Sequence, residues 1–174
     1  MKKAIVLVLA LVMLVSLVGC GASGSVKTGV GVVTSTMKSK AATAEAAGTA
    51  QVDSVIAAVT IDQDGKILTV DIDSAQTKIG FDAAGQLTAE GSSDVPTKTD
   101  LGADYGMKKA SGIGMEWDEQ IVELEKWLVG KTADQVSGMA LNEGKATDAD
   151  LTSKVTITVT DYQKAVLEAI ANAK

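Results

Sequence analysis

Residues 110–117, Ala-Ser-Gly-Ile-Gly-Met-Glu-Trp, form the first segment of the chain suited to hold a ligand. Ser111, Gly112 and Gly114 make a glycine-bearing turn that leads into the strongest helical pattern in the sequence. Backbone N–H groups at the start of a helix are free to donate hydrogen bonds, and the helix dipole attracts negative charge there. This turn is therefore a candidate anion-binding loop, and its alternative is an ordinary loop that enters a helix.

Residues 152–158, Thr-Ser-Lys-Val-Thr-Ile-Thr, form the second such segment and are dense in hydroxyl groups. Ser153 and Thr156 stand just before a second helical pattern. Because hydroxyl groups both donate and accept hydrogen bonds, this segment is another candidate for contact with a ligand. The alternative is a strand that turns its threonines toward solvent.

Acidic residues offer weaker candidates for a metal site or a catalytic site. Asp62-Gln-Asp64-Gly65 resembles the start of a calcium-binding EF-hand loop, but Gly65 is fourth where that loop needs a glycine in sixth place. We expect a β-turn there instead. The other acidic residues of interest are better explained as the solvent-facing side of a helix than as a catalytic pair. They are Glu116, Asp118, Glu119, Glu123 and Glu125.

The composition excludes several kinds of chemistry. The 174 residues include no His and one Cys, which excludes Ser-His-Asp triads, Cys-His dyads, zinc sites and an internal disulfide. A formal net charge of −6 leaves no basic surface for a phosphate backbone, so we expect no nucleic-acid partner. A hydrophobic fraction of 46% and a charged fraction of 22% are typical of a globular protein.

The single cysteine, Cys20, follows a secretory pattern. Lys2 and Lys3 precede an apolar run over residues 4–18, and small residues follow it. The run is shorter than the about 20 residues of a membrane-spanning helix. Leu17-Val18-Gly19-Cys20 also resembles the lipobox of bacterial lipoproteins, in which the cysteine receives lipid and becomes the first residue after cleavage. The alternative is a plain signal peptide with a chance cysteine.

Several predicted strands and helices would position these candidate ligand-binding segments. Residues 30–37 are predicted to be a strand, and residues 51–61 and 66–72 a hairpin around the turn at 62–65. A second hairpin is expected around residues 82–85, and residues 91–104 read as a loop.

The helical patterns come later in the chain. Trp117, Ile121, Leu124 and Leu128 share one face of a helix over residues 115–129. A capping box at 132–135 predicts a short helix that ends near Gly138, and residues 154–160 alternate like a half-buried strand. A second capping box at 160–163 predicts a final helix with Tyr162, Val166 and Ile170 inward.

This order of segments resembles the FMN-binding domain family, which includes flavin-carrying subunits of sodium-pumping quinone reductases and Rnf-type complexes, and surface lipoproteins of extracellular electron transfer. The family has a Thr-Pro-Gly-Leu-Gly-like loop, to which residues 110–114 correspond, and later Ser-Gly-Ala-Thr-x-Thr-Ser, in which Ser153, Thr156 and Thr158 match the first Ser and the two Thr. The resemblance covers residues 29–173, with an insert between about 74 and 110.

The resemblance implies which residues contact FMN. Ser111, Gly112 and Gly114 would offer the loop contacts, and Ser153 and Thr156 would hold the phosphate end. In the family the threonine that Thr156 matches can be joined to FMN through a phosphoester. Lys154 and Val155 are bulkier than the Gly and Ala of the family, so we expect flavin to be non-covalent or absent rather than covalent.

Together these patterns predict an α+β protein of one domain, with antiparallel hairpins packed against two or three C-terminal helices. Residues 1–19 would be a signal peptide, 20–28 the lipidated Cys20 and a flexible tether, and 29–174 the FMN-binding-like domain. We expect a protein anchored to the outer face of the cell membrane that carries electrons to or from a redox partner in that membrane. It is expected to bind or carry electrons rather than act as a catalyst. The alternative is a non-redox surface lipoprotein that binds a small ligand or partner on a fold that has lost its flavin.

Overall fold

Three long strands form an antiparallel sheet in the order β1-β2-β3, which confirms the expected α+β class. They are β1 (Lys27–Ser35), β2 (Gly48–Ile61) and β3 (Ile67–Phe81). The structure, a computed structural model, describes residues 24–89, 91 and 94–174. The expected signal peptide and Cys20 lie outside these residues.

The hairpin between β2 and β3 forms where it was predicted. Val55, Ala57, Val59 and Ile61 of β2 are buried and alternate with more exposed residues, as the period of a strand requires. The Asp62 carboxylate accepts the N–H groups of residues 64 and 66 at 2.9 Å each, and Gly65 adopts a φ of 74°. The acidic pair at 62 and 64 therefore makes a turn, as expected.

The strand β3 is longer than predicted, because it pairs with β2 as far as Phe81 opposite Gly48. Residues 79–81 thus belong to β3, and the expected second hairpin is a tight turn with one bridge between Phe81 and Leu87. Asp82 accepts two backbone N–H groups there in the same way as Asp62.

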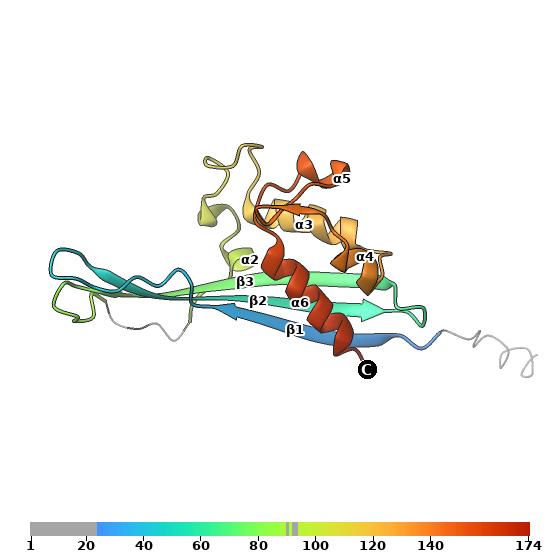
Figure 1. Cartoon of the computed structure of the whole chain (residues 1–174), viewed down its shortest axis with the longest axis horizontal. Coiled ribbons are helices and arrows are strands. Elements are labelled where there is room, and N and C mark those ends of the chain that lie inside the picture. Colours follow the sequence, from blue (N-terminus) through green and yellow to red (C-terminus); the bar gives the residue numbers. More distant parts are fainter. Residues whose placement is uncertain (1–23, 90, 92–93) are drawn as a thin grey trace, which may run out of the picture.

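The helices lie over one face of the sheet (Figure 1). They are α3 (Trp117–Leu128), α4 (Ala133–Ser137), α5 (Ala149–Thr152) and α6 (Thr160–Ala171), with a small hairpin of β4 (Leu141–Asn142) and β5 (Lys145–Ala146). The predicted inward face of α3 is confirmed, since Trp117, Ile121, Leu124 and Leu128 are all buried. The part of the chain that the structure describes contains no helix long and apolar enough to cross a membrane.

Two glycines let α6 pack directly on the backbone of β1. A Cβ at Gly29 would lie 2.0 Å from the Ala169 carbonyl oxygen, and one at Gly31 would lie 2.0 Å from that of Ala165. Helix and strand are therefore in contact without intervening side chains. Glycine at both positions of the Gly-Val-Gly sequence has this packing role.

The segment before α6 is not the predicted strand. Residues 155–159 pair with no strand among the described residues, because their backbone N–H groups bond elsewhere. The N–H of Val155 donates to the Leu151 carbonyl at 2.7 Å, and that of Val159 donates to the Gly144 carbonyl at 2.7 Å. Val155 and Val159 are buried, so the alternation of apolar and polar residues in this segment reflects burial and not strand pairing.

Two other predictions need correction. Residues 91–104 are not all loop, since α2 (Lys98–Leu101) and the 3₁₀ helix η1 (Gly102–Tyr105) lie there, with Thr97 and Asp100 in a reciprocal cap. The capping box expected at Thr160 is absent, because the N-cap of α6 is Val159 and the Gln163 side chain donates to the Val136 carbonyl instead.

Candidate functional site

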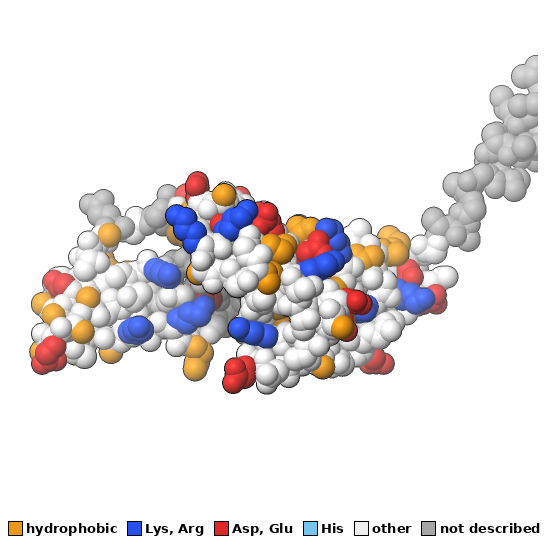
Figure 2. All heavy atoms as spheres, turned by 90° about the horizontal axis from the view of Figure 1, so that it is seen from above, with side chains coloured by type: hydrophobic (Ala, Val, Ile, Leu, Met, Phe, Trp, Pro, Cys, Tyr) orange, Lys and Arg blue, Asp and Glu red, His pale blue; other side chains and the backbone are white. Residues whose placement is uncertain are grey.

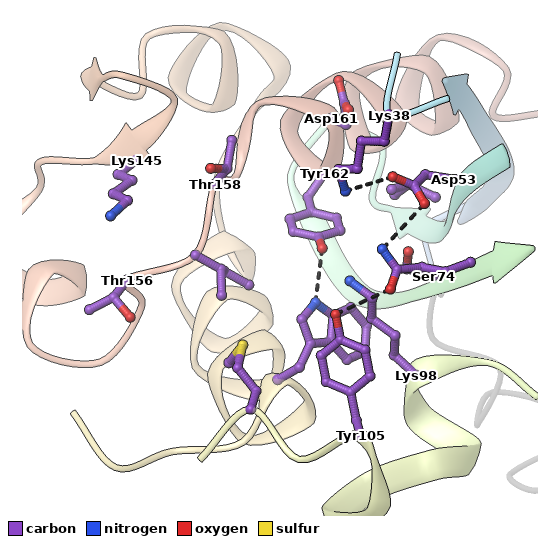
Figure 3. A pocket seen from close by; sticks show the side chains of 15 residues that line it. Lys38, Asp53, Ser74, Lys98, Tyr105, Lys145, Thr156, Thr158, Asp161 and Tyr162 are labelled. Atoms are coloured by element: carbon purple, nitrogen blue, oxygen red, sulfur yellow. Dashed lines mark hydrogen bonds and ion pairs between the residues drawn. The ribbon is translucent and has the colours of Figure 1, made fainter. Parts of the chain in front are cut away.

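A cavity of about 440 Å³ lies between the sheet and the helices, which is within the range of small-molecule sites. Six segments supply its walls: the start of the β1–β2 connection, the sheet, α2 with η1 and the residues after it, α3, β5, and residues 156–162. Figure 3 shows the side chains that line this cavity, which we call the central pocket. They are Lys38, Asp53, Val55, Ser74, Gln76, Lys98, Tyr105, Met107, Trp117, Lys145, Thr156, Ile157, Thr158, Asp161 and Tyr162.

The central pocket collects most of the aromatic side chains of an aromatic-poor chain. The sequence has two Trp, two Tyr and one Phe, and Tyr105, Trp117 and Tyr162 all line the pocket. Trp117 donates its ring N–H to the Tyr162 oxygen at 2.8 Å, and the two rings meet edge to face with centroids 6.0 Å apart. Burial raises the pKa of Tyr162 to about 12, so its hydroxyl keeps its proton at neutral pH and can donate it.

Lys98 is the one buried lysine among the described residues, with 8% of its surface exposed. Its ammonium nitrogen lies 4.9 Å from the centre of the Tyr105 ring and 5.1 Å from that of Trp117. It forms no hydrogen bond or ion pair with any residue that the structure describes. Burial lowers the pKa of Lys98 to about 8, while the two ring faces favour the charged form.

The carboxylate on the inner wall of the pocket is already paired. Asp53 lies 2.6 Å from the Lys38 ammonium and accepts side-chain N–H groups from Gln51 at 2.7 Å and Gln76 at 3.2 Å. Burial alone would raise the pKa of Asp53, but Lys38 and the two amides outweigh it and lower the pKa. Among the described residues, Lys98 is therefore a buried cation of the central pocket without a close anionic partner.

Of the site residues predicted from the sequence, Thr156 lines the central pocket. Ser111, Gly112, Gly114 and Ser153 do not. The contacts with FMN that the resemblance implies for these residues remain predictions. Gly112, Gly114 and Ser153 lie exposed on turns outside the walls of the central pocket.

The two predicted segments are nevertheless joined by one buried side chain. Gln120 of α3 is 0% exposed and donates to the Ser111 hydroxyl at 3.1 Å. Its carbonyl oxygen accepts the N–H of Thr156 at 2.9 Å and the Thr156 hydroxyl at 3.3 Å. The loop and the hydroxyl-rich segment thus meet through Gln120, so Ser111 and Thr156 serve to position the two segments.

The start of α3 is not an open anion site. Glu116 caps the helix and accepts an N–H of its first turn, while the Glu116 N–H donates to the Glu119 carboxylate at 2.7 Å. These carboxylates occupy the place where a bound anion would gain from the helix dipole. Lys154 likewise pairs with Glu123 at 2.8 Å, and this contact raises the pKa of Lys154.

Sequence reasoning missed Lys38, Asp53, Lys98 and Tyr105 as pocket residues. The scarcity of aromatic residues could have pointed to Tyr105, because a rare aromatic residue in an aliphatic core marks a place where side-chain size and shape matter. Figure 2 shows lysine side chains spread over the visible face and mixed with acidic ones, and sixteen lysines in the sequence give no hint of which one is buried.

No protein-family model, no curated protein and no solved structure matches this chain.

Proposed function

We propose that this chain is a lipid-anchored extracytoplasmic protein that binds FMN without a covalent bond in the central pocket. In this role it passes electrons between a redox partner in the membrane and an acceptor outside it. The observation that supports the proposal is the central pocket itself, where three aromatic rings and an unpaired buried lysine surround about 440 Å³.

The pocket residues suit a flavin in kind. Tyr105 offers partly exposed ring surface for a planar aromatic group, Trp117 and Tyr162 contribute buried apolar walls, and Lys98 offers positive charge for a phosphate. Hydroxyl groups of Ser74 and Thr158 line the same cavity and can donate hydrogen bonds. When bound, the flavin would supply the electron transfer, and the protein would bind it, orient it and limit its contact with water.

Covalent attachment at Thr156 is the weaker form of this proposal. Its hydroxyl already donates to Gln120, and its backbone N–H donates to the same oxygen. Figure 3 places Thr156 apart from the cluster of Lys98, Tyr105 and Tyr162. A ligand that used the inner pocket would therefore not need a bond to Thr156.

A visible spectrum of the full-length protein, purified in detergent, tests the proposal. We expect the flavin absorption in the native protein, or its appearance after added FMN and dialysis, and release of the flavin on denaturation. A denatured band that still fluoresces as flavin would show covalent attachment. No flavin in either state, with no uptake of FMN at high micromolar concentration, would reject the redox function.

The second candidate is a non-redox lipoprotein that binds another small molecule in the same pocket. The loop at 110–114 favours it, because Gly112 and Gly114 lie outside the pocket and offer a flavin no contact there. The same spectrum separates the two functions, since this candidate has no flavin.

A further inference from the structure

The surroundings of Lys98 bear on how the central pocket recognises a ligand. Burying an ammonium removes its hydration, which is costly unless an opposite charge or hydrogen bonds replace the water. Among the described residues, Lys98 contacts only the faces of Tyr105 and Trp117 with its ammonium, and the nearby Asp53 carboxylate is engaged by Lys38 at 2.6 Å. Lys98 lines the cavity, and its ammonium donates no hydrogen bond to any residue that the structure describes.

We propose that Lys98 is the anion-recognising residue of the central pocket and holds the negatively charged group of an aromatic ligand. The ring of that ligand would lie against Tyr105, which is partly exposed, whereas Trp117 and Tyr162 are buried at 1% and 7% exposure. For FMN, on which the proposed function rests, the charged group is the phosphate, bound at Lys98 instead of at Thr156.

A second lysine of the pocket provides a matched comparison. Lys145 also lines the cavity, but its residue is exposed, and Figure 3 shows it on the side of Thr156, apart from Lys98. An ion pair formed by a buried ammonium is screened less by water and salt than one at an exposed residue. Lys98 is therefore expected to contribute more to the affinity for an anion than Lys145.

Replacement by methionine separates recognition from packing. In Lys98→Met the unbranched side chain keeps contact with the Tyr105 and Trp117 rings but loses the charge. If Lys98 only fills space, its replacement would lower the melting temperature of the protein and leave its preference among ligands unchanged. If Lys98 is kept for recognition, its replacement is expected to lower the affinity of the protein for the ligand, while the melting temperature stays level or rises.

The experiment titrates the full-length protein in detergent by calorimetry with three probes: FMN, riboflavin and para-nitrophenyl phosphate. The wild type, Lys98→Met, Lys98→Arg and Lys145→Met are compared, each with its melting temperature. We expect the wild type to bind riboflavin about 10- to 100-fold more weakly than FMN, as loss of a charge-assisted contact predicts. Lys98→Met should bind FMN no better than riboflavin, Lys98→Arg should restore the preference in part, and Lys145→Met should keep it.

The outcomes distinguish this inference from the flavin function. If Lys98→Met binds FMN as tightly as the wild type, or the wild type binds riboflavin as tightly as FMN, the role of Lys98 is overturned and the flavin function stands. If FMN fails to bind but para-nitrophenyl phosphate binds in a Lys98-dependent way, the flavin function falls and Lys98 keeps its role. If neither phosphate probe binds, both are rejected.

Discussion

Lys98 links the protonation of the central pocket to the stability of the fold. Burial lowers its pKa from 10.5 to about 8, so between these values the unfolded chain binds a proton that the native protein does not. Stability rises with pH wherever the unfolded state binds more protons. The unfolding free energy is therefore expected to increase as the pH rises from about 8 toward 10.5, and below about 8 the cost of the buried charge is constant.

The test measures urea unfolding of wild type and Lys98→Met across this pH window. The wild type should gain on the order of 1–3 kcal/mol relative to the variant, a range reduced because the aromatic rings stabilise the cation. Equal pH slopes would show that Lys98 is not desolvated. The other charged or titratable groups near Lys98 are present in both proteins and cancel in the difference: Lys38, Asp53, Asp73, Lys78 and Tyr105.

Gln120 shows a residue whose role could not be predicted from the sequence. A glutamine on the apolar face of a helix has no distinguishing pattern, yet this one is fully buried and connects Ser111 with Thr156. Thr156 could be predicted as a pocket residue because hydroxyl-rich segments before helices are visible in sequence. Its hydrogen-bond partner is 36 positions away and depends on the packing of α3.

Gln120→Met should destabilise the protein by about 1–3 kcal/mol. The change keeps the side-chain volume but leaves the N–H of Thr156 without its acceptor in a partly buried place. Chemical denaturation measures the effect, with Gln63→Met in the exposed turn after β2 as the matched control. If both variants lose the same small amount, the Gln120 contacts do not hold the two segments together.

Among the elements, β1 depends most on a partner far along the chain. Its outer edge is covered by α6 and the chain end: Glu168 accepts the N–H of Val32 at 3.1 Å, and Asn172 donates to the Val30 carbonyl at 3.0 Å. Uncovered edge strands invite pairing with other chains, so these side chains protect the sheet. Gly31 makes the arrangement feasible, since it admits α6 against the strand.

Gly31→Ala is expected to cost at least about 3 kcal/mol, because its Cβ would meet the helix backbone instead of a movable side chain. Gly112→Ala is the control, because the space around Gly112 is open to 4 Å and its backbone suits other residues. That variant should stay within about 0.5 kcal/mol of the wild type. Thermal or urea unfolding compares the two, and similar small losses would mean that α6 can move away from β1 at little cost.

The sequence pattern predicted the β2–β3 hairpin, the buried face of α3 and the existence of α4 and α6, since each shows its own periodicity or turn residues. It failed for residues 155–159 because alternation reports burial and not backbone pairing, and their hydrogen bonds go to Leu151, Gln120 and Gly144. It also failed for α2, where a four-residue helix is too short to show a period.

At the scale of the whole molecule, the net charge and the proposed lipid anchor bear on where the central pocket would lie relative to the membrane. The chain has a formal net charge of −6, so anionic lipid head groups would repel the domain rather than bind it. In the proposed lipoprotein, attachment would come from an acyl anchor, which hydrophobic burial makes insensitive to salt. Residues 20–26 can reach at most about 25 Å when extended, which would keep the pocket near a redox partner in the membrane.

The anchor is tested by changing the cysteine alone. Cys20→Ala should release the protein from the membrane fraction or leave it uncleaved, because the alanine cannot receive lipid. Ser23→Ala, three residues later, keeps the cysteine and should behave as wild type. Fractionation after a high-salt wash, combined with metabolic labelling by a radioactive fatty acid, measures attachment and lipidation together. A processed Cys20→Ala protein that still fractionates with the membrane would show that another feature of the chain holds it there, and the lipoprotein proposal would fail while the pocket proposals remained testable.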